Sequence, residues 1–374
     1  MQQVALLVVI TVASLFIFSP RIKKILKGQI QKQKLRTICQ SEPDENKGTI
    51  QVTSIHVHPI KSLRPVSVQS TKLTHLGLPG DRALMLVRPS PSTKQYRFVT
   101  QRQCSALATI NVSLPTLVTT SQGTSTMIEI SNSDKTRKVF VDVSPETLNT
   151  NPVRYTAGLW DDTVQVVDVG DKAAEFLQSI MKSPQDDDDY SDVRLVAQLE
   201  NDERRVDSRY CPAAAVDFMG RVPRVSLTDG FPILIASEES LEELNRRLKE
   251  KGKDDLPMSR FRPNIVCKGL QKAFEEDEWK AIQIGENGPI FHVVKGCPRC
   301  KQSCTDQVTG ERFDEPLETL KEFRALGKDK EDVYFAQNVV LQSSGEGKEI
   351  CVGDTIRVLT SGDPVWDEDT VQAE

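Results

Sequence analysis

The alternation of apolar and polar positions predicts many short strands and few helices. From residue 50, Ile50 and Val52 share one parity, whereas Ile55 and Val57 share the other. Such alternation is typical of a half-buried strand, and the change of parity indicates a bulge near residues 53–54. Short apolar runs separated by turn residues follow at 66–68, 84–87, 96–100, 108–112, 127–130, 138–143 and 164–167. This density of short strands favours a barrel or a folded sheet.

The second half of the chain shows the same pattern after an acidic connection. Residues 171–181 predict a helix with one apolar side, and the acidic run 183–190 predicts an exposed boundary between two domains. Ser237 predicts the start of a second helix, and a third is expected near 317–326. Strands are predicted at 193–199, 233–236, 265–267, 281–284, 290–294, 334–342 and 355–359. The sequence therefore predicts a mainly β (α+β) protein with domains at 49–185 and 193–361 and a tail at 362–374.

The amino terminus has the pattern of a retained membrane anchor. Residues 4–18 are almost continuously apolar, and the positive charges come after them, from Arg21 to Lys27. A cleaved secretory signal usually has the reverse order, so we expect an anchor with its basic flank over 1–28, contacting the membrane through residues 4–20. The basic flank favours a cytosolic face for the rest of the chain, and residues 29–48 predict a polar tether. A signal peptide with an unusual start is the alternative.

Composition narrows the possible functions. The 374 residues carry a net charge of -5 and 38% hydrophobic residues, which favours a globular protein with a core and does not indicate a general nucleic-acid binder. Of the eight cysteines, only Cys297, Cys300 and Cys304 lie close together. In a chain of this length such a group favours a reducing compartment and a thiol or metal function over a disulfide framework.

The cysteine group lies beside fixed positive charge, in Lys295-Gly-Cys-Pro-Arg-Cys-Lys301. Neighbouring cations stabilise a thiolate, which is a nucleophile and a ligand for soft metals. Together with His292, the three cysteines could form a Cys3His zinc knuckle. The Cys-Pro-Arg-Cys spacing also fits a thiol exchange site, and two cysteines kept only for packing are a third alternative.

Basic and small polar residues stand at the ends of other predicted strands. They are Lys61, Ser62, Asp81, Arg82, Arg102, Arg262 and Asn264. Each by itself is typical of a solvated loop, but guanidinium groups and strand-end amides also bind phosphates and polar heterocycles. Together they indicate an anionic cofactor beside a cysteine-ligated metal.

With these residues in view, the chain resembles the MOSC-domain family, and within it the proteins like the mitochondrial amidoxime-reducing component. The resemblance covers residues 49–359 in order. The matching motifs are His58-Pro-Ile-Lys-Ser62, Gly80-Asp-Arg82, Asp229 with Pro232, Ser237-Glu238, Phe261-Arg-Pro-Asn-Ile-Val266, Cys297-Pro-Arg-Cys300, Thr309-Gly310, Glu315-Pro-Leu-Glu-Thr-Leu320 and Val352-Gly-Asp354.

The resemblance implies an amino-terminal MOSC β-barrel domain, a MOSC β-barrel domain and a molybdenum-pterin cofactor (Mo-molybdopterin) held between them. Cys300 would be the metal ligand, with Cys297 in support. Asp229 would be an acidic residue near the metal that handles protons or holds the metal-bound oxygen. The residues expected to hold the cofactor are Lys61, Ser62, Arg82, Arg102, Arg262, Asn264, Pro298 and Arg299.

The same resemblance implies reduction of small N-hydroxylated substrates such as amidoximes, with electrons from cytochrome b5 and its NADH-dependent reductase. It also favours the outer mitochondrial membrane, although an endoplasmic reticulum anchor would look similar. A carrier of the molybdenum cofactor or of sulfur, and a membrane-tethered zinc protein, remain alternatives. The chain departs from the family pattern at Lys301, Gln302, Ser303 and Cys304, and in the stretch 200–225, whose arginines we expect to be solvated.

Overall fold

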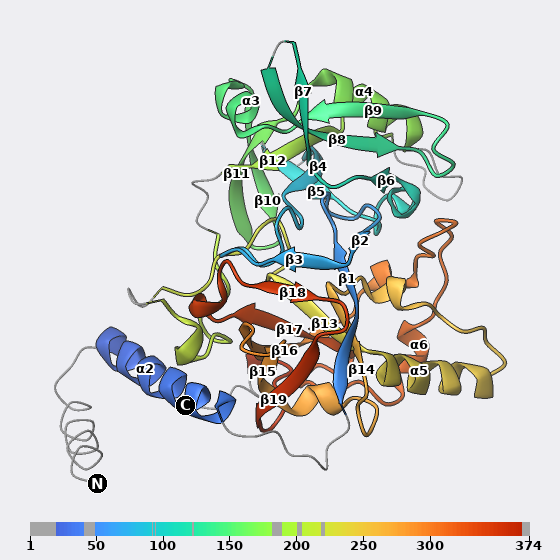
Figure 1. The fold of residues 1–374 in the computed structure, drawn as a ribbon. Helices are drawn as coiled ribbons and strands as arrows, with labels where there is room; N and C mark the ends of the chain where they lie inside the picture. The colour runs from blue at the N-terminus through green and yellow to red at the C-terminus, as the bar shows by residue number, and fades with distance from the viewer. Residues whose placement is uncertain are drawn as a thin grey trace, which may run out of the picture.

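The protein is described by a computed structural model that covers residues 20–40, 49–91, 93, 95–121, 123–181, 189–199, 204–217 and 221–368. Two β-rich units lie against one another, the first at the top of Figure 1 and the second below it. The predicted anchor at residues 4–18 lies outside the described part of the chain. Within the described part, we find no helix with both the length and the apolar character needed to span a bilayer.

The first unit is a closed barrel with strand order β10-β11-β12-β4-β5. The strands are β4 (Leu84–Pro89), β5 (Tyr96–Val99), β10 (Arg154–Leu159), β11 (Asp162–Asp168) and β12 (Arg194–Gln198). Met85, Leu159 and Val196 pack inside it. Because β10 and β11 remain paired up to Leu159 and Asp162, Trp160 lies at the tip of a tight hairpin.

A smaller sheet and two helices extend the core of the first barrel. Its strands are β6 (Asn111–Val112), β7 (Thr116–Thr120), β8 (Gly123–Ser131) and β9 (Lys138–Asp142), and the helices are α3 (Pro145–Thr150) and α4 (Asp171–Ile180). Ile128 of β8 and Leu177 of α4 share one apolar cluster with Leu86 and Leu195 of the barrel. The predicted helix at 171–181 is confirmed as α4.

The second unit is a larger sheet with strand order β14-β13-β17-β16-β15-β19-β1-β2. Its strands are β1 (Ile50–Val57), β2 (Val66–Val68), β13 (Ile233–Ser237), β14 (Ile265–Lys268), β15 (Trp279–Ile284), β16 (Ile290–Pro298), β17 (Tyr334–Leu341) and β19 (Thr355–Ser361). Because β1 also pairs with β14, the sheet closes into a second barrel. The register of β1 shifts between Val52 and Ser54, which confirms the predicted bulge.

Helices and short connections cover the outside of the second barrel. Ser237 caps α5 (Glu238–Glu250) as predicted, because its hydroxyl accepts a hydrogen bond from the amide of Ser240. α6 (Leu317–Lys321) lies within the segment where a helix was expected. The remaining elements are β3 (Ser70–Lys72), β18 (Glu349–Cys351) and the 3-10 turns η1 (Ser105–Thr109), η2 (Ala213–Ala215), η3 (Met258–Phe261), η4 (Glu275–Glu278), η5 (Lys301–Cys304) and η6 (Ser343–Gly345).

Two strands belong to a different barrel from the one expected. β1, predicted to open the first domain, pairs with β14 and β19 of the second barrel, where Figure 1 shows it in blue. β12, predicted to open the second domain, pairs with β4 and β11 of the first. Alternation identifies a strand but not its partner, so the spatial division differs from a boundary at residues 185–193. The first barrel is inserted between β2 and β13 of the second.

The predicted tether is also helical over much of its length, since α2 spans Pro20–Cys39. Lysine, glutamine and leucine, all of which are present in α2, are good helix formers. The helix was not predicted because residues 29–39 show no sustained apolar period. Leu35 packs against Ala214 on the second barrel's surface. A Cβ atom at Gly28 would come within 2.2 Å of the carbonyl oxygen of Ala213, so this close approach requires glycine.

Candidate cofactor site between the two barrels

A cavity of about 140 Å³ lies where the two barrels meet, and it gathers nearly all of the predicted site residues. Those that line it are Lys61, Ser62, Arg82, Asp229, Arg262, Asn264, Cys297, Pro298, Arg299 and Cys300. Arg102 is the predicted residue that does not line it. Segments more than 200 positions apart in sequence therefore meet at one place.

The backbone turns sharply at three of the lining residues. Ser62, Arg82 and Arg262 have φ values of 71°, 46° and 54°. Non-glycine residues seldom adopt positive φ, and such positions gather at functional sites, where the surrounding structure holds them. Arg262 directly follows η3, Ser62 lies in the loop after β1 and Arg82 lies just before β4. All three line the cavity between the barrels.

The floor of the cavity is a buried polar cluster organised by Asp81. Its carboxylate accepts hydrogen bonds from Arg82 Nη1 at 2.5 Å, Asn264 Nδ2 at 3.0 Å and the His58 amide at 2.7 Å. Burial would raise the pKa of Asp81, but the charge of Arg82 and the bonds from Arg82 and His58 hold it below its usual value. Asp81 therefore stays ionised and fixes Arg82 and Asn264 at the edge of the cavity.

Arg262 brings a second guanidinium to the same floor. Its Nη2 donates to the carbonyl oxygen of Leu63 at 2.7 Å, and its Nη1 donates to Gln307 Oε1 at 3.2 Å. Burial, followed by the neighbouring charge of Arg82, lowers the pKa of Arg262 to about 9. Arg262 is still charged at neutral pH, so the floor holds two cations whose mutual repulsion a bound anion would relieve.

Several buried polar atoms around this cavity have no partner among the described residues. They are the hydroxyls of Ser62 and Thr228 and the Nε and Nη1 atoms of Arg260. All three residues line the cavity. Buried polar atoms are nearly always hydrogen-bonded in native proteins. Two hydroxyls and a guanidinium edge beside two further arginines are the donor set that a phosphate or a polar heterocycle requires.

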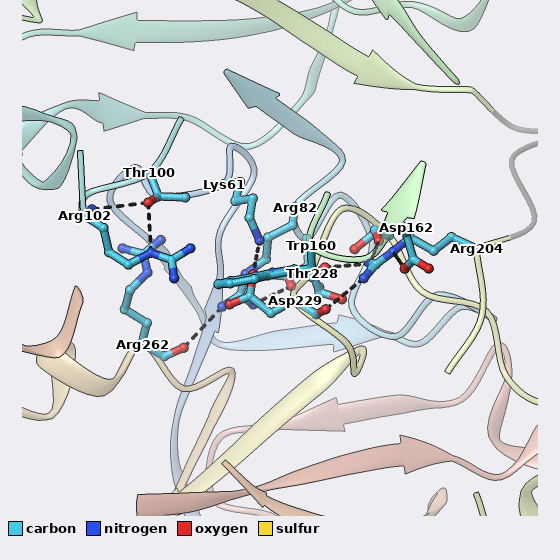
Figure 2. A network of polar contacts seen from close by, with 12 residues as sticks. Lys61, Arg82, Thr100, Arg102, Trp160, Asp162, Arg204, Thr228, Asp229 and Arg262 are labelled. Atoms are coloured by element: carbon cyan, nitrogen blue, oxygen red, sulfur yellow. Dashed lines mark hydrogen bonds and ion pairs between the residues drawn. The ribbon is translucent and has the colours of Figure 1, made fainter. Parts of the chain in front are cut away.

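A second layer of side chains lies over this floor and is shown in Figure 2. Lys61 Nζ forms an ion pair with Asp229, and the indole nitrogen of Trp160 donates to Asp229 Oδ1 at 3.0 Å. The Asp229 side chain is 67% exposed, and it lines the cavity. Burial would raise its pKa, yet Lys61, Trp160 and Arg102 together lower it below its usual value. Asp229 is thus an ionised acceptor.

Arg102 lies at the mouth of the site and not in the cavity. Its guanidinium stacks 4.2 Å from the ring of Trp160, and its Nε atom donates to Thr100 Oγ1 at 3.3 Å. Trp160 has a φ of 57° and is 42% exposed. The first barrel thus contributes an aromatic ring and a guanidinium to the entrance, while the acid that Trp160 contacts comes from the second unit.

The cysteines differ clearly in their surroundings. Cys300 is exposed and precedes η5, whereas Cys304 is buried and its thiol donates to the carbonyl oxygen of Asp314 at 3.3 Å. Burial raises the pKa of the Cys297 thiol, which contacts the carbonyl oxygen of Pro298 at 3.7 Å. The guanidinium of Arg299 donates to the carbonyl oxygens of Phe261 and Phe335, so it anchors the loop that presents Cys300.

The zinc-knuckle arrangement is not formed. His292 is buried on β16 and contacts Gln342 through its Nε2 atom at 3.2 Å. In the described ranges, no three histidine, cysteine, aspartate or glutamate side chains converge to hold a metal ion. A β-strand directs successive side chains to opposite faces, and on β16 His292 lies beneath α2 and away from the cysteine loop.

Among the residues of the site that were not predicted are Trp160, Arg204, Thr228 and Arg260. Arg204 was expected to be solvated, but it is 7% exposed. It donates to Asp162 and to the carbonyl oxygens of Ser226, Thr228 and Asp229. These bonds fix the segment that carries Asp229. By contrast, Arg209 and Arg221 are exposed and pair with nearby aspartates, as expected for solvated arginines.

The two-barrel fold and the site between the barrels agree with a known class of protein. Residues 49–184 match the MOSC N-terminal beta barrel domain, and residues 222–357 match the MOSC domain. The chain belongs to the MOSC-domain family. It is 30% identical to the mitochondrial amidoxime reducing component 2 of Rattus norvegicus over 321 residues, which is 84% of this chain and 82% of that protein. It is 29% identical to the protein of the same name from Bos taurus over 289 residues, or 76% and 75%.

A second group of relatives is similar over a shorter region. The molybdenum cofactor sulfurase of Aspergillus terreus is 30% identical over 145 residues, which is 36% of this chain and 17% of the sulfurase. The relatives that match over most of this chain are thus the amidoxime-reducing components. Both groups support a MOSC protein whose function relates to the molybdenum cofactor.

Proposed function

We propose that this protein is a molybdenum-cofactor reductase that converts small N-hydroxylated substrates, such as amidoximes, to the N–H compound and water. The observation that carries the proposal is the cavity between the barrels, with the Cys300 thiol at its edge and Arg82 and Arg262 on its floor. The names of the relatives that cover most of the chain support the substrate class. As a division of the sequence, domains at 49–185 and 193–361 are part of the proposal, although β1 and β12 each pair with strands of the other barrel.

The chemistry of the lining residues fits the cofactor. Arg82, Arg262 and Arg260 would hold its phosphate, and Ser62 and Asn264 would bind polar atoms of its pterin. Cys300 offers an accessible sulfur as the protein ligand. When bound, the cofactor would supply a metal that exchanges two electrons and a dithiolene that provides two further sulfur ligands. Arg299 would act indirectly, by holding the Cys300 loop.

Lys61 and Asp229 would manage charge and protons during N–O reduction, which consumes two electrons and two protons. Asp229 is ionised, so it would attract a cationic amidine group and keep Lys61 in place. Burial lowers the pKa of Lys61, although the charge of Asp229 opposes this shift. A lysine with a lowered pKa gives up its proton more readily, so Lys61 is the better proton donor to the leaving oxygen. The negative charge of Asp229 would then help Lys61 to take up a proton again from solvent.

The electron supply and the location follow from the same proposal. Electrons would come singly from cytochrome b5, reduced by its NADH-dependent reductase. A membrane anchor at residues 4–20 would hold the protein on the cytosolic face of the outer mitochondrial membrane or the endoplasmic reticulum. The relatives that cover most of the chain are named as mitochondrial proteins, which favours mitochondria.

A second function is favoured by the sulfurase similarity. A molybdenum-cofactor or sulfur carrier would use the same cavity and the same cysteine, but without reducing a substrate. It therefore predicts bound pterin and molybdenum with no turnover of N-hydroxylated compounds. The two functions differ in one measurable property, which is activity of the loaded protein.

The full chain should be purified from cells that make the molybdenum cofactor and analysed for molybdenum. An aryl amidoxime is then offered with cytochrome b5, its reductase and NADH. We expect near-stoichiometric molybdenum and NADH-dependent formation of the amidine. Cys300→Ser should lower the rate at least about 100-fold, because the ligand itself is lost, while the circular dichroism spectrum stays the same.

Cys304→Ser is the matched control, since that thiol is buried and bonded to Asp314 outside the cavity. It should keep both molybdenum and activity. Full activity in Cys300→Ser would contradict the ligand assignment. Molybdenum without any amidoxime reduction would favour the carrier, and zinc in place of molybdenum would contradict both functions.

A further inference from the structure

The face of α2 that points away from the protein carries an apolar stripe. Ile22 and Leu26 are 41% and 40% exposed, and Ile30 continues the row one turn further while partly buried. Residues four apart share one side of a helix. Another side of α2, with Gly28 and Leu35, packs on the second barrel. The helix therefore has two apolar sides, of which the barrel covers one.

Positive charge borders this stripe. α2 contains no aspartate or glutamate, and its basic residues are Arg21, Lys23, Lys24, Lys27, Lys32, Lys34 and Arg36. This contrasts with the net charge of -5 of the whole chain. Lys23, Lys27 and Lys34 also line a cavity of about 900 Å³ between α2 and the barrel. A cluster of lysines on a helix attracts the negative headgroups of an anionic bilayer, and exposed isoleucine and leucine beside it add apolar contact.

We infer that α2 lies on the surface of an anionic phospholipid bilayer. Ile22, Leu26 and Ile30 enter the headgroup region, and Lys23, Lys27 and Lys34 pair with lipid phosphates. The position of α2 in the chain favours a bilayer over an acidic protein, because the helix starts directly after the apolar residues 4–18. Juxtamembrane basic clusters of this kind bind anionic leaflets. This inference does not depend on whether the site reduces N-hydroxylated compounds.

The attachment of α2 to the barrel gives the membrane contact a structural effect. Lys32 Nζ donates to the carbonyl oxygen of Val216 at 2.8 Å, and Gln31 Oε1 accepts from the Ala214 amide at 3.0 Å. At the end of the helix, Arg357 donates to the carbonyl oxygen of Cys39 at 3.1 Å. Because α2 is bonded along its length, its contact with lipid sets the orientation of the second barrel relative to the bilayer.

The test uses the full chain with Leu26→Trp and compares its emission spectrum with that of the parent. Vesicles are made of phosphatidylcholine alone or with added phosphatidylserine. The native Trp279 and Trp366 are buried, and the contribution of Trp160 cancels in the difference. We expect the introduced tryptophan to shift to the blue with anionic vesicles only, and added salt to reverse the shift.

Changing Lys23, Lys27 and Lys34 to Gln should lower the affinity for anionic vesicles, read from the blue shift, about fivefold for each charge removed. The matched control changes the exposed Lys135, Lys172 and Lys253 to Gln and should leave it unchanged. An unshifted spectrum in a chain that sediments with anionic vesicles would overturn the inference. So would an equal shift with both kinds of vesicle, or a shift with polyglutamate and none with lipid, which would assign the face to an acidic protein.

Discussion

Two buried polar networks in this protein look alike in composition and differ in completeness. The first lies between the barrels and contains Lys61, Arg82, Asp229 and Arg262. The second lies on the outer wall of the second barrel. There Asp277 accepts hydrogen bonds from Arg324 at 2.7 and 3.1 Å and from Gln337 at 2.6 Å. Beside it, Glu276 accepts from Ser237 and Ser240 at 3.0 and 2.7 Å.

The difference shows how a polar network can be assigned to folding or to binding. In the Glu276–Asp277 network, each of these side chains has a protein partner. In the network between the barrels, Ser62, Thr228 and Arg260 keep buried atoms without a partner among the described residues, and Asp229 is open to the cavity. An unsatisfied buried polar atom costs about 1–3 kcal/mol, so such a set is retained where a ligand completes it.

Arg324→Met should have the largest effect on stability, because it leaves Asp277 buried without its counter-ion. We expect the free energy of unfolding to fall by about 3–5 kcal/mol, measured by urea denaturation. Arg246→Met is the control, since Arg246 is exposed and pairs with Glu243 and Glu250 in solvent. Its loss should cost less than about 1 kcal/mol. Equal losses of unfolding free energy in the two variants would mean that the buried ion pair stabilises the protein no more than the exposed one does.

The pH dependence of stability tests the Glu276–Asp277 network in a second way. Burial, and then the charge of Asp277, raises the pKa of Glu276 from 4.5 to about 7. The folded protein therefore keeps a proton that the unfolded chain has lost. The contribution of Glu276 to stability is complete below pH 4.5, falls as the pH rises to about 7, and is constant above that value.

The loss of unfolding free energy between pH 4.5 and about 7 amounts to at most about 3 kcal/mol. Glu276→Gln should abolish this loss, as measured by urea denaturation across that pH range. Glu278→Gln in the same turn is the control, because Glu278 is half exposed and pairs with Lys272. A parent protein whose slope matches that of Glu276→Gln would show that the two serines stabilise the carboxylate and not the carboxyl.

Ser62→Ala should have the smallest effect on stability, within about 0.5 kcal/mol, because its hydroxyl has no partner in the described structure. If the open network binds the cofactor, this variant should retain about tenfold less molybdenum under competition with a chelator. Ser240→Ala should show the reverse, a loss of about 1–3 kcal/mol with normal molybdenum. Equal destabilisation of the two variants would remove the distinction between the networks.

Local motifs in the sequence predicted many of the residues that line this cavity. Lys61, Ser62, Arg262 and Cys300 stand at strand ends next to turn residues, where a single segment already indicates an accessible polar group. Trp160 carries no such signal, because its role depends on a hairpin from the first barrel reaching Asp229 of the second unit. Arg204 is similar, since only the folded chain shows that its guanidinium binds three carbonyl groups.

The fold was predictable at the level of elements and less so at the level of pairing. Alternation identified β1 as a strand and an apolar run identified β12, but the pairing of β1 with β14 joins residues more than 200 positions apart. No property of either segment alone specifies that partner. α2 was missed for a different reason, since its apolar residues fall on two sides of the helix and no single apolar face stands out in the sequence.

The insertion of the first barrel into the second also imposes an order on biosynthesis. β1 leaves the ribosome early, but its partners β14 and β19 follow only at residues 265–268 and 355–361. The inserted barrel has all of its strands by residue 198 and can close while translation continues. The floor of the cavity between the barrels needs Asn264 beside Asp81, and its edge needs Cys300. A ligand of this cavity can therefore be bound only after most of the polypeptide has been made.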